Sequence, residues 1–342
     1  MRPRQPILFV SAALACLVWA SCTDGPTELP GFALSGTVSD GRLEGMVVPG
    51  VTVRLEGTGE PTITGADGGY RFPNVRGRVR VTVRGEPSYL GQSADIAVDA
   101  DRTLDFVLEH TGTPPFDGTP WIIPDIITPS DPTSFGTVTY AGRGIRLVFD
   151  RRVRSWINVN AYLFDAQFGE REVEFQVNPE FGSREAARTE VDRFGPAIGR
   201  LPAALLSNFR EVEINAGEGL FGGSSPNGGL LIHTEDNGTA FALRRGFIEE
   251  VLLHEAAHMS LDMLYADSAD WQAAQAADGV YISEYARDYP QREDIAESIL
   301  MYFAVRYVPD RLPPALHWVI ITSIPNRIAY FDDEDLDMSP FK

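Results

Sequence analysis

Two histidines, His254 and His258, stand four residues apart in a run of small and apolar residues. On an α-helix this separation is a rotation of about 40°, so both imidazoles leave the same face one turn apart. Glu255 is the one carboxylate within Val251–Met259. A solvated surface helix would carry more charge than this. The segment therefore predicts a buried helix around which the rest of its domain packs.

The histidine pair has the spacing of metal ligands. Two imidazole nitrogens one helical turn apart can both approach a zinc ion at about 2.0–2.1 Å. Glu255 can accept a proton from a water whose pKa the ion lowers toward about 7. The simpler alternative is a helix whose histidines only satisfy hydrogen bonds. Two of the five histidines of the chain fall at this spacing around a glutamate, which favours the metal, so we expect one Zn²⁺ ion here.

A catalytic zinc usually has three protein ligands, so a third must come from elsewhere in the chain. Metzincins continue the motif with a glycine and a histidine, where this chain has Leu261 and Leu264. About 35 residues beyond the motif, Glu293 and Glu297 lie four apart on one face of a predicted helix. Asp262 is a further candidate, although the helix axis carries it away from the metal. All three acidic residues stay open on spacing alone.

The segments Ile282–Ala286 and Arg292–Ala304 resemble the gluzincin zinc metallopeptidases, in particular their anthrax lethal factor-like branch. In that family a tyrosine precedes a Glu-x-x-Ala-Glu stretch, which here begins at Glu293. The resemblance implies that Glu293 is the third zinc ligand and that Glu297 orients a metal-bound histidine. It also implies that Glu255 is the general base of peptide hydrolysis.

The same resemblance implies that a tyrosine donates a hydrogen bond to the oxyanion of the tetrahedral intermediate. Tyr285 has the better local context, because alanine follows it as in the family. It stands eight residues before Glu293, whereas the family has seven. Tyr289, four residues before Glu293, is the alternative.

The second half of the chain places strands before helices, which is an α+β order. We expect residues 136–342 to form an α+β zincin-type metallopeptidase domain. The resemblance further implies that Gly228–Thr234 is an edge strand that pairs with an extended peptide substrate. The expected strands are Gly136–Tyr140, Ile145–Phe149, Trp156–Phe164, Glu172–Val177, Glu211–Asn215 and Leu230–His233, and the expected helices are Arg184–Leu206, Ala242–Tyr265, Trp271–Ala277, Glu293–Val308 and Pro313–Ser323.

Residues 32–110 have the pattern of short strands separated by turn-forming Gly and Asp residues. This pattern predicts an all-β sandwich. Four stretches resemble the carboxypeptidase regulatory-like domain, a transthyretin-like sandwich: Ser35–Asp40, Gly50–Leu55, Asp67–Phe72 and Val75–Gly77. This resemblance implies a spacer or interaction role and no catalytic residues. The expected strands are Phe32–Val38, Val51–Glu56, Tyr70–Phe72, Val79–Arg84 and Leu104–Leu108.

The N-terminus has the pattern of an export signal. Arg2 and Arg4 precede an apolar run over Ile7–Ala20, too short to span a bilayer comfortably. The run ends in Trp19–Cys22, which resembles a lipoprotein lipobox. We expect a signal peptide over residues 1–21, a lipid anchor on Cys22, a tether over 22–31, and an exported protein of the outer membrane or cell surface. An ordinary cleaved signal and an uncleaved anchor are the alternatives.

The net charge of −19 repels phosphate backbones, so nucleic acid is not an expected partner. Residues 111–135, rich in Pro and Gly, are expected to be a linker between the two domains. The predicted function is zinc-dependent hydrolysis of a peptide or protein substrate. The alternatives are a surface adhesion lipoprotein with a vestigial zinc site, and a zinc hydrolase that acts on another substrate.

Overall fold

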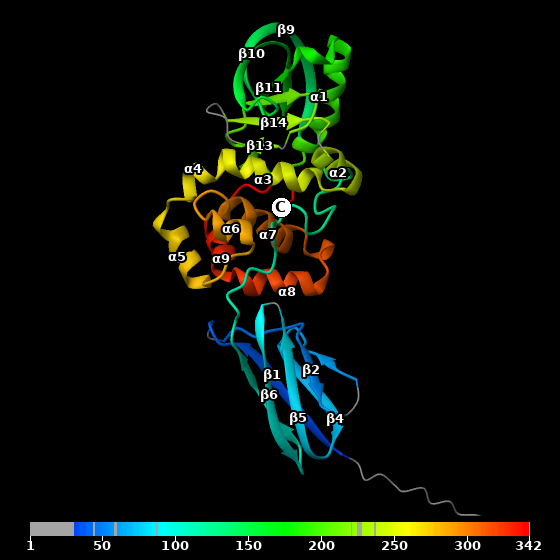
Figure 1. Cartoon of the computed structure of the whole chain (residues 1–342), viewed down its shortest axis with the longest axis vertical. Helices are drawn as coiled ribbons and strands as arrows, with labels where there is room; N and C mark the ends of the chain where they lie inside the picture. The colour runs from blue at the N-terminus through cyan, green and yellow to red at the C-terminus, as the bar shows by residue number, and fades with distance from the viewer. Residues whose placement is uncertain are drawn as a thin grey trace, which may run out of the picture.

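A computed structural model describes residues 31–341 except 44, 58–59, 87, 220, 224–227 and 236. Residues 1–30 lie outside the described residues. They include the predicted signal peptide, the expected lipid-anchor site Cys22 and most of the predicted tether. Among the residues described, no helix is long and apolar enough to cross a membrane. Figure 1 shows a β-sandwich at one end and a mixed region of helices and one sheet at the other.

The N-terminal region is a β-sandwich of two sheets, as predicted. One sheet has the order β4-β1-β7, with β8 also paired to β1, and the other has the order β3-β2-β5-β6. The strands are β1 (Phe32–Asp40), β2 (Thr52–Leu55), β3 (Thr62–Ile63), β4 (Gly69–Val75), β5 (Gly77–Gly85), β6 (Tyr89–Val98), β7 (Arg102–Thr103) and β8 (Phe106–Leu108).

Alternation of buried and exposed residues accounts for this sandwich. Val53, Leu55, Val81 and Val83 point inward from two neighbouring strands, while the residues between them face solvent or are half-buried. Strand β6 was not predicted from the sequence. Its middle is polar and small-residue rich and largely exposed, so it lacks the apolar signal of a core strand.

The C-terminal region has one six-stranded sheet in the order β13-β14-β12-β11-β10-β9. Strands β11, β12 and β14 run parallel, and β13 is antiparallel to β14 at one edge. The sheet therefore mixes both pairings, and the whole region is mixed α/β. Its strands are β9 (Phe135–Asp150), β10 (Ser155–Phe168), β11 (Arg171–Val177), β12 (Glu211–Asn215), β13 (Gly222–Gly223) and β14 (Gly229–His233).

Helix α3 lies between this sheet and helices α5 to α9, in contact with β13 on one side and α7 on the other (Figure 1). Eleven of its thirteen residues are buried, as its apolar sequence predicts. The helices are α1 (Arg184–Ile198), α2 (Asn237–Arg245), α3 (Ile248–Ser260), α4 (Asp262–Tyr265), α5 (Ala269–Asp278), α6 (Glu284–Asp288), α7 (Asp294–Tyr307), α8 (Pro314–Ser323) and α9 (Pro325–Asp333), with short 3₁₀ turns at Pro179–Phe181, Ala203–Leu206 and Pro309–Arg311.

Two expected helices and two expected strands differ from the structure in their bounds. The single helix expected over Ala242–Tyr265 is wrong, because Gly246 has a φ of 74° and separates α2 from α3. The helix expected from Arg184 ends at Ile198, shortly before Pro202. The two strands expected over 136–149 are one strand, β9, whose register shifts at a bulge beside Gly142.

The segment expected as a linker lacks helices and longer strands, but part of it belongs to the C-terminal core. Ile126 and Ile127 are buried there. Their backbone N–H groups donate to Oε1 of Glu250 on α3, at 2.6 and 3.2 Å. Thr119 is buried against α7. This stretch therefore holds the helix that carries the two histidines.

Candidate metal centre

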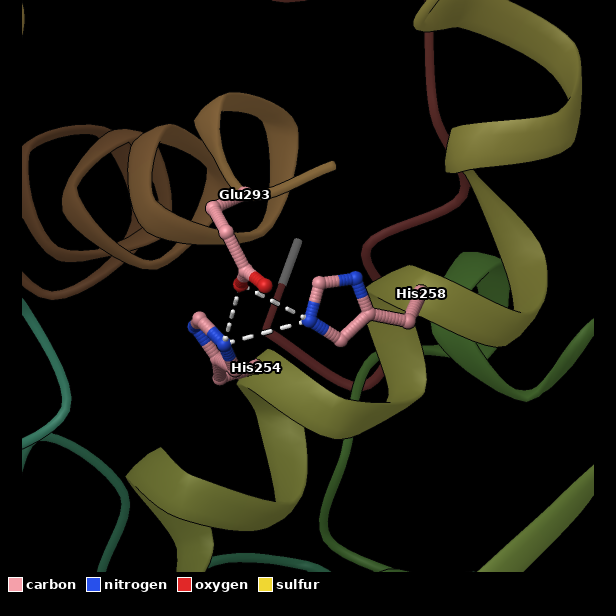
Figure 2. A group of neighbouring side chains, drawn as sticks. All are labelled: His254, His258 and Glu293. Carbon is pink, nitrogen blue, oxygen red and sulfur yellow. Dashed lines mark hydrogen bonds and ion pairs between the residues drawn. The ribbon is translucent and has the colours of Figure 1, made fainter. Parts of the chain in front are cut away.

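Three side chains from two helices converge on one point. His254 and His258 project from adjacent turns of α3, and Glu293 reaches them from the start of α7 (Figure 2). The Nε2 atoms of the two histidines are 3.2 Å apart. Oε2 of Glu293 lies 3.4 Å from Nε2 of His254 and 3.3 Å from Nε2 of His258.

This triangle has the size that a tetrahedral metal requires. Ligand atoms at about 2.0–2.1 Å from a tetrahedral zinc are about 3.3 Å from one another. Oε2 of Glu293 is buried and has no hydrogen-bond partner among the described residues. A buried carboxylate oxygen without a partner is costly, and a cation at the centre of the triangle would satisfy it. The donor set of two imidazoles and one carboxylate therefore fits zinc.

The other oxygen of Glu293 is already engaged. Arg292 donates from its guanidinium to Oε1 at 2.8 Å, which leaves Oε2 as the single free ligand atom of this carboxylate. Burial would raise the pKa of Glu293, but the imidazoles of His254 and His258 beside its carboxylate hold the pKa well below its usual range. Glu293 is therefore an anion at neutral pH, as a metal ligand must be.

Two further carboxylates orient the imidazoles from behind. Oδ2 of Asp262 lies 2.7 Å from Nδ1 of His258. Oε1 of Glu297 lies 3.3 Å from Nδ1 of His254, an ion-pair distance without the alignment of a hydrogen bond. The Nδ1 contacts turn the Nε2 atoms toward the triangle. The structure thus places Glu297 and Asp262, both considered as third ligands, behind the histidines.

Glu297 is itself fixed by the chain segment that precedes the sheet. Its Oε2 accepts a hydrogen bond of 2.7 Å from the backbone N–H of Thr119, and the hydroxyl of Thr119 donates to the Glu297 carbonyl. Burial raises the pKa of Glu297. The sequence offered no signal for Thr119, because it is 178 residues from its partner.

The acidic surroundings favour positive charge at His258. Burial lowers the pKa of this imidazole, but the hydrogen bond to Asp262 and the nearby carboxylate of Glu293 outweigh burial and raise the pKa to about 10. A site whose carboxylates stabilise a cation at this point is also suited to a divalent metal. The electrostatics therefore agree with the geometry of the triangle.

Glu255 lies beside the ligands and faces the edge of the sheet. Its Oε2 accepts a hydrogen bond of 2.5 Å from the backbone N–H of Gly223 on β13. A Cβ at Gly223 would come within 1.9 Å of the carbonyl oxygen of Glu255, so only glycine permits this approach. The glycine-rich run Gly217–Gly223 was the available signal for this contact.

The edge strand beside the histidine helix is β13, so the expectation for Gly228–Thr234 is wrong. Strand β14, which forms most of that segment, lies between β12 and β13 and is buried along its length. The sequence of β13 is only Gly222–Gly223, which carries no hydrophobic pattern. Without that pattern, the sequence could not show that a further strand, β13, pairs with β14 and takes the edge position.

The two candidate tyrosines occupy different positions. Tyr285 lines the same cavity as His254, Glu255 and Glu293, and it is 39% exposed. Burial, followed by a hydrogen bond to Glu293, raises the pKa of Tyr285 to about 12, so the hydroxyl keeps its proton. Tyr289 is not among the residues that line this cavity, although its ring packs 5.4 Å from the ring of Tyr285.

Backbone contacts position Tyr285. Helix α6 begins after Ser283, whose side chain accepts a hydrogen bond from the N–H of Ala286. The N–H groups of Glu284 and Tyr285 donate to the carbonyls of Phe116 and Asp117. The segment expected as a linker therefore sets the place of both Tyr285 and Glu297.

The cavity around the triangle has a volume of about 1210 Å³. It is large enough to take several residues of an extended peptide or another ligand of that size. It runs from the histidines and Tyr285 to aromatic residues of β9 and β10.

Residues 33–109 match the family model of the carboxypeptidase regulatory-like domain. No curated protein matches the chain. Solved structures with some likeness include a cohesin–X-dockerin complex from Acetivibrio cellulolyticus, at 22% identity over 26% of this chain and 59% of that one, with a TM-score of 0.21. A DUF3823 family protein from Parabacteroides merdae has 16% identity over 40% and 56%, with a TM-score of 0.19.

The Bacillus anthracis TIE protein has 11% identity over 43% of this chain and 31% of its own length, with a TM-score of 0.20. The chain spans less than two thirds of each of these three structures. Their TM-scores are too low to support an argument about fold or activity. The family model, in contrast, identifies the N-terminal domain of this chain as a carboxypeptidase regulatory-like domain.

Proposed function

We propose that the C-terminal region is a zinc-dependent metallopeptidase of the gluzincin type with a zincin-like fold. His254, His258 and Glu293 would hold the metal. The observation that carries the proposal is the buried triangle of their ligand atoms, with sides of 3.2 to 3.4 Å. When bound, zinc supplies a Lewis acid that polarises the scissile carbonyl and acidifies a water.

Glu255 has the position of the general base. It lies next to the ligand His254 in the chain and lines the cavity, but its carboxylate is outside the triangle. It would take a proton from the attacking water and then deliver it to the leaving amine nitrogen. The N–H of Gly223 holds Oε2, which orients the carboxylate for both transfers.

Substrate binding would use the open edge of β13. An extended peptide can add to a sheet edge through backbone hydrogen bonds, and this edge lies directly beside Glu255. The export signal and the lipobox-like Trp19–Cys22 support a lipid-anchored enzyme at the outer membrane or cell surface. The N-terminal domain would serve as a spacer between that anchor and the catalytic region.

Loss of the Tyr285 hydroxyl is expected to slow hydrolysis without removing zinc. Removal of one oxyanion donor costs about 10²- to 10³-fold in kcat. We therefore expect Tyr285→Phe to lower kcat by that factor with little change in KM. Tyr289→Phe is the matched control and should stay close to the wild type. Equal effects of the two substitutions would contradict the assignment.

The function itself is tested with the purified full chain and a peptide library, in the presence and absence of a zinc chelator. Cleavage that stops with the chelator and returns when zinc is added supports a metallopeptidase. Bound zinc without cleavage of any peptide would instead favour a binding lipoprotein with a vestigial site. Chelator-insensitive cleavage would contradict the proposed mechanism.

A further inference from the structure

A second buried carboxylate, Glu213, lies at the end of the cavity away from the histidines. It is on β12 and is only 2% exposed, yet it is among the residues that line the cavity. Its Oε2 accepts a hydrogen bond of 3.1 Å from the N–H of Phe149. Its Oε1 has no hydrogen-bond partner within the part of the chain that the structure describes.

No cationic side chain balances Glu213 among the described residues. Arg151 lines the same cavity, but its guanidinium donates to the carbonyl of Phe221. Burial raises the pKa of Glu213 to about 7, and repulsion from the carboxylate of Glu211 acts in the same direction. An unpaired buried carboxylate is costly, so this end of the cavity is suited to a positive charge.

The walls around Glu213 are apolar. Phe149 and Trp156 stand side by side with ring centroids 5.4 Å apart, and Leu231 lies on the neighbouring strand. Trp156 is 42% exposed, so the pocket is open to solvent at this wall. Such a pocket suits a side chain whose apolar stem packs on the aromatic rings and whose cationic end reaches the carboxylate.

The single unpartnered carboxylate oxygen of Glu213 favours lysine over arginine. Oε1 is the oxygen without a partner among the described residues, whereas Oε2 already accepts one hydrogen bond from the Phe149 N–H. A guanidinium binds best when both carboxylate oxygens accept, whereas an ammonium needs a single acceptor.

The sheet register links this pocket to the candidate metal centre. Glu213 pairs with Leu231, and Leu231 pairs with Gly222, which precedes the glycine that contacts Glu255. Strands in a sheet are about 4.8 Å apart, so Glu213 lies about 10 Å from β13.

We propose that Glu213 is a specificity-determining residue that selects peptides with a lysine side chain near the scissile bond. This inference rests on the proposed peptidase function, because it assumes that a peptide occupies the cavity.

The first test measures kcat/KM of the full chain on a positional peptide library. The wild type should prefer lysine at one subsite by about 10- to 100-fold over norleucine, as expected for a charge-assisted hydrogen bond. Glu213→Gln keeps an acceptor for the Phe149 N–H but removes the charge, so it should abolish the preference while norleucine peptides are cleaved as before. Glu185→Gln, at an exposed position of α1 that does not line the cavity, is the control. Unchanged lysine preference in Glu213→Gln would overturn the proposal.

A second test separates this inference from the peptidase function. Two fluorescein-labelled peptides that differ only by lysine or norleucine are titrated into Glu255→Gln and into Glu213→Gln/Glu255→Gln. Tighter binding of the lysine peptide by at least tenfold, lost in the second protein, supports the pocket even if no peptide is cleaved by the wild type. Equal affinities for both peptides overturn the pocket and leave the metallopeptidase proposal standing.

Discussion

Glu255→Gln is expected to retain one zinc ion per chain and to lower kcat by about 10²- to 10⁴-fold, the usual contribution of a general base. The amide cannot take a proton from water, so the attacking nucleophile is no longer generated. Zinc should remain because the triangle of ligand atoms does not include Glu255. The amide oxygen of glutamine can still accept the hydrogen bond from Gly223 that the carboxylate accepts.

The measurement combines metal analysis of the purified protein with hydrolysis of a peptide that the wild type cleaves. Glu284→Gln is a suitable control, because Glu284 is on α6 with a half-exposed side chain and pairs with Arg287 on the same helix. It should change neither zinc content nor rate. Full activity of Glu255→Gln would refute the mechanism, and loss of zinc would show that Glu255 belongs to the metal site.

The local part of this site could be predicted because helical periodicity is a local rule. His258 follows His254 by four positions, so on a helix the two side chains leave the same face. The apolar residues around them indicate that this helix is buried. The structure brings Glu293 to the same point across 35 residues of chain. That pairing depended on resemblance to a family, since spacing alone left Glu297 and Asp262 open.

The remaining contacts could not be predicted because they join segments far apart in the sequence. Thr119 meets Glu297 across 178 residues, and Gly223 meets Glu255 through a two-residue strand with no hydrophobic pattern. The Pro and Gly content of residues 111–135 predicts a stiff linker, but it does not indicate which of its side chains pack into the C-terminal core. Its isoleucines at 126 and 127 are nevertheless part of the C-terminal core.

Glu293→Ala is expected to cause the largest loss of zinc affinity among the acidic residues around the site. It removes one of three ligand atoms and leaves two imidazoles, which are too few for a catalytic zinc site. Glu297→Ala removes the contact to Nδ1 of His254 and the acceptor of the Thr119 N–H, and Asp262→Asn removes the negative charge beside Nδ1 of His258. Loss of such an outer partner typically costs about 10- to 100-fold in metal affinity.

The dissociation constant of each protein for zinc can be measured by competition with a chelator of known affinity. We expect Glu293→Ala to raise the dissociation constant clearly more than either outer substitution, because Oε2 of Glu293 is, among the described residues, the oxygen that lies within 3.4 Å of both Nε2 atoms. If Glu297→Ala loses more affinity than Glu293→Ala, Glu297 is the ligand and α7 must rotate when the metal binds. The order of the two constants therefore decides which of the two carboxylates completes the site.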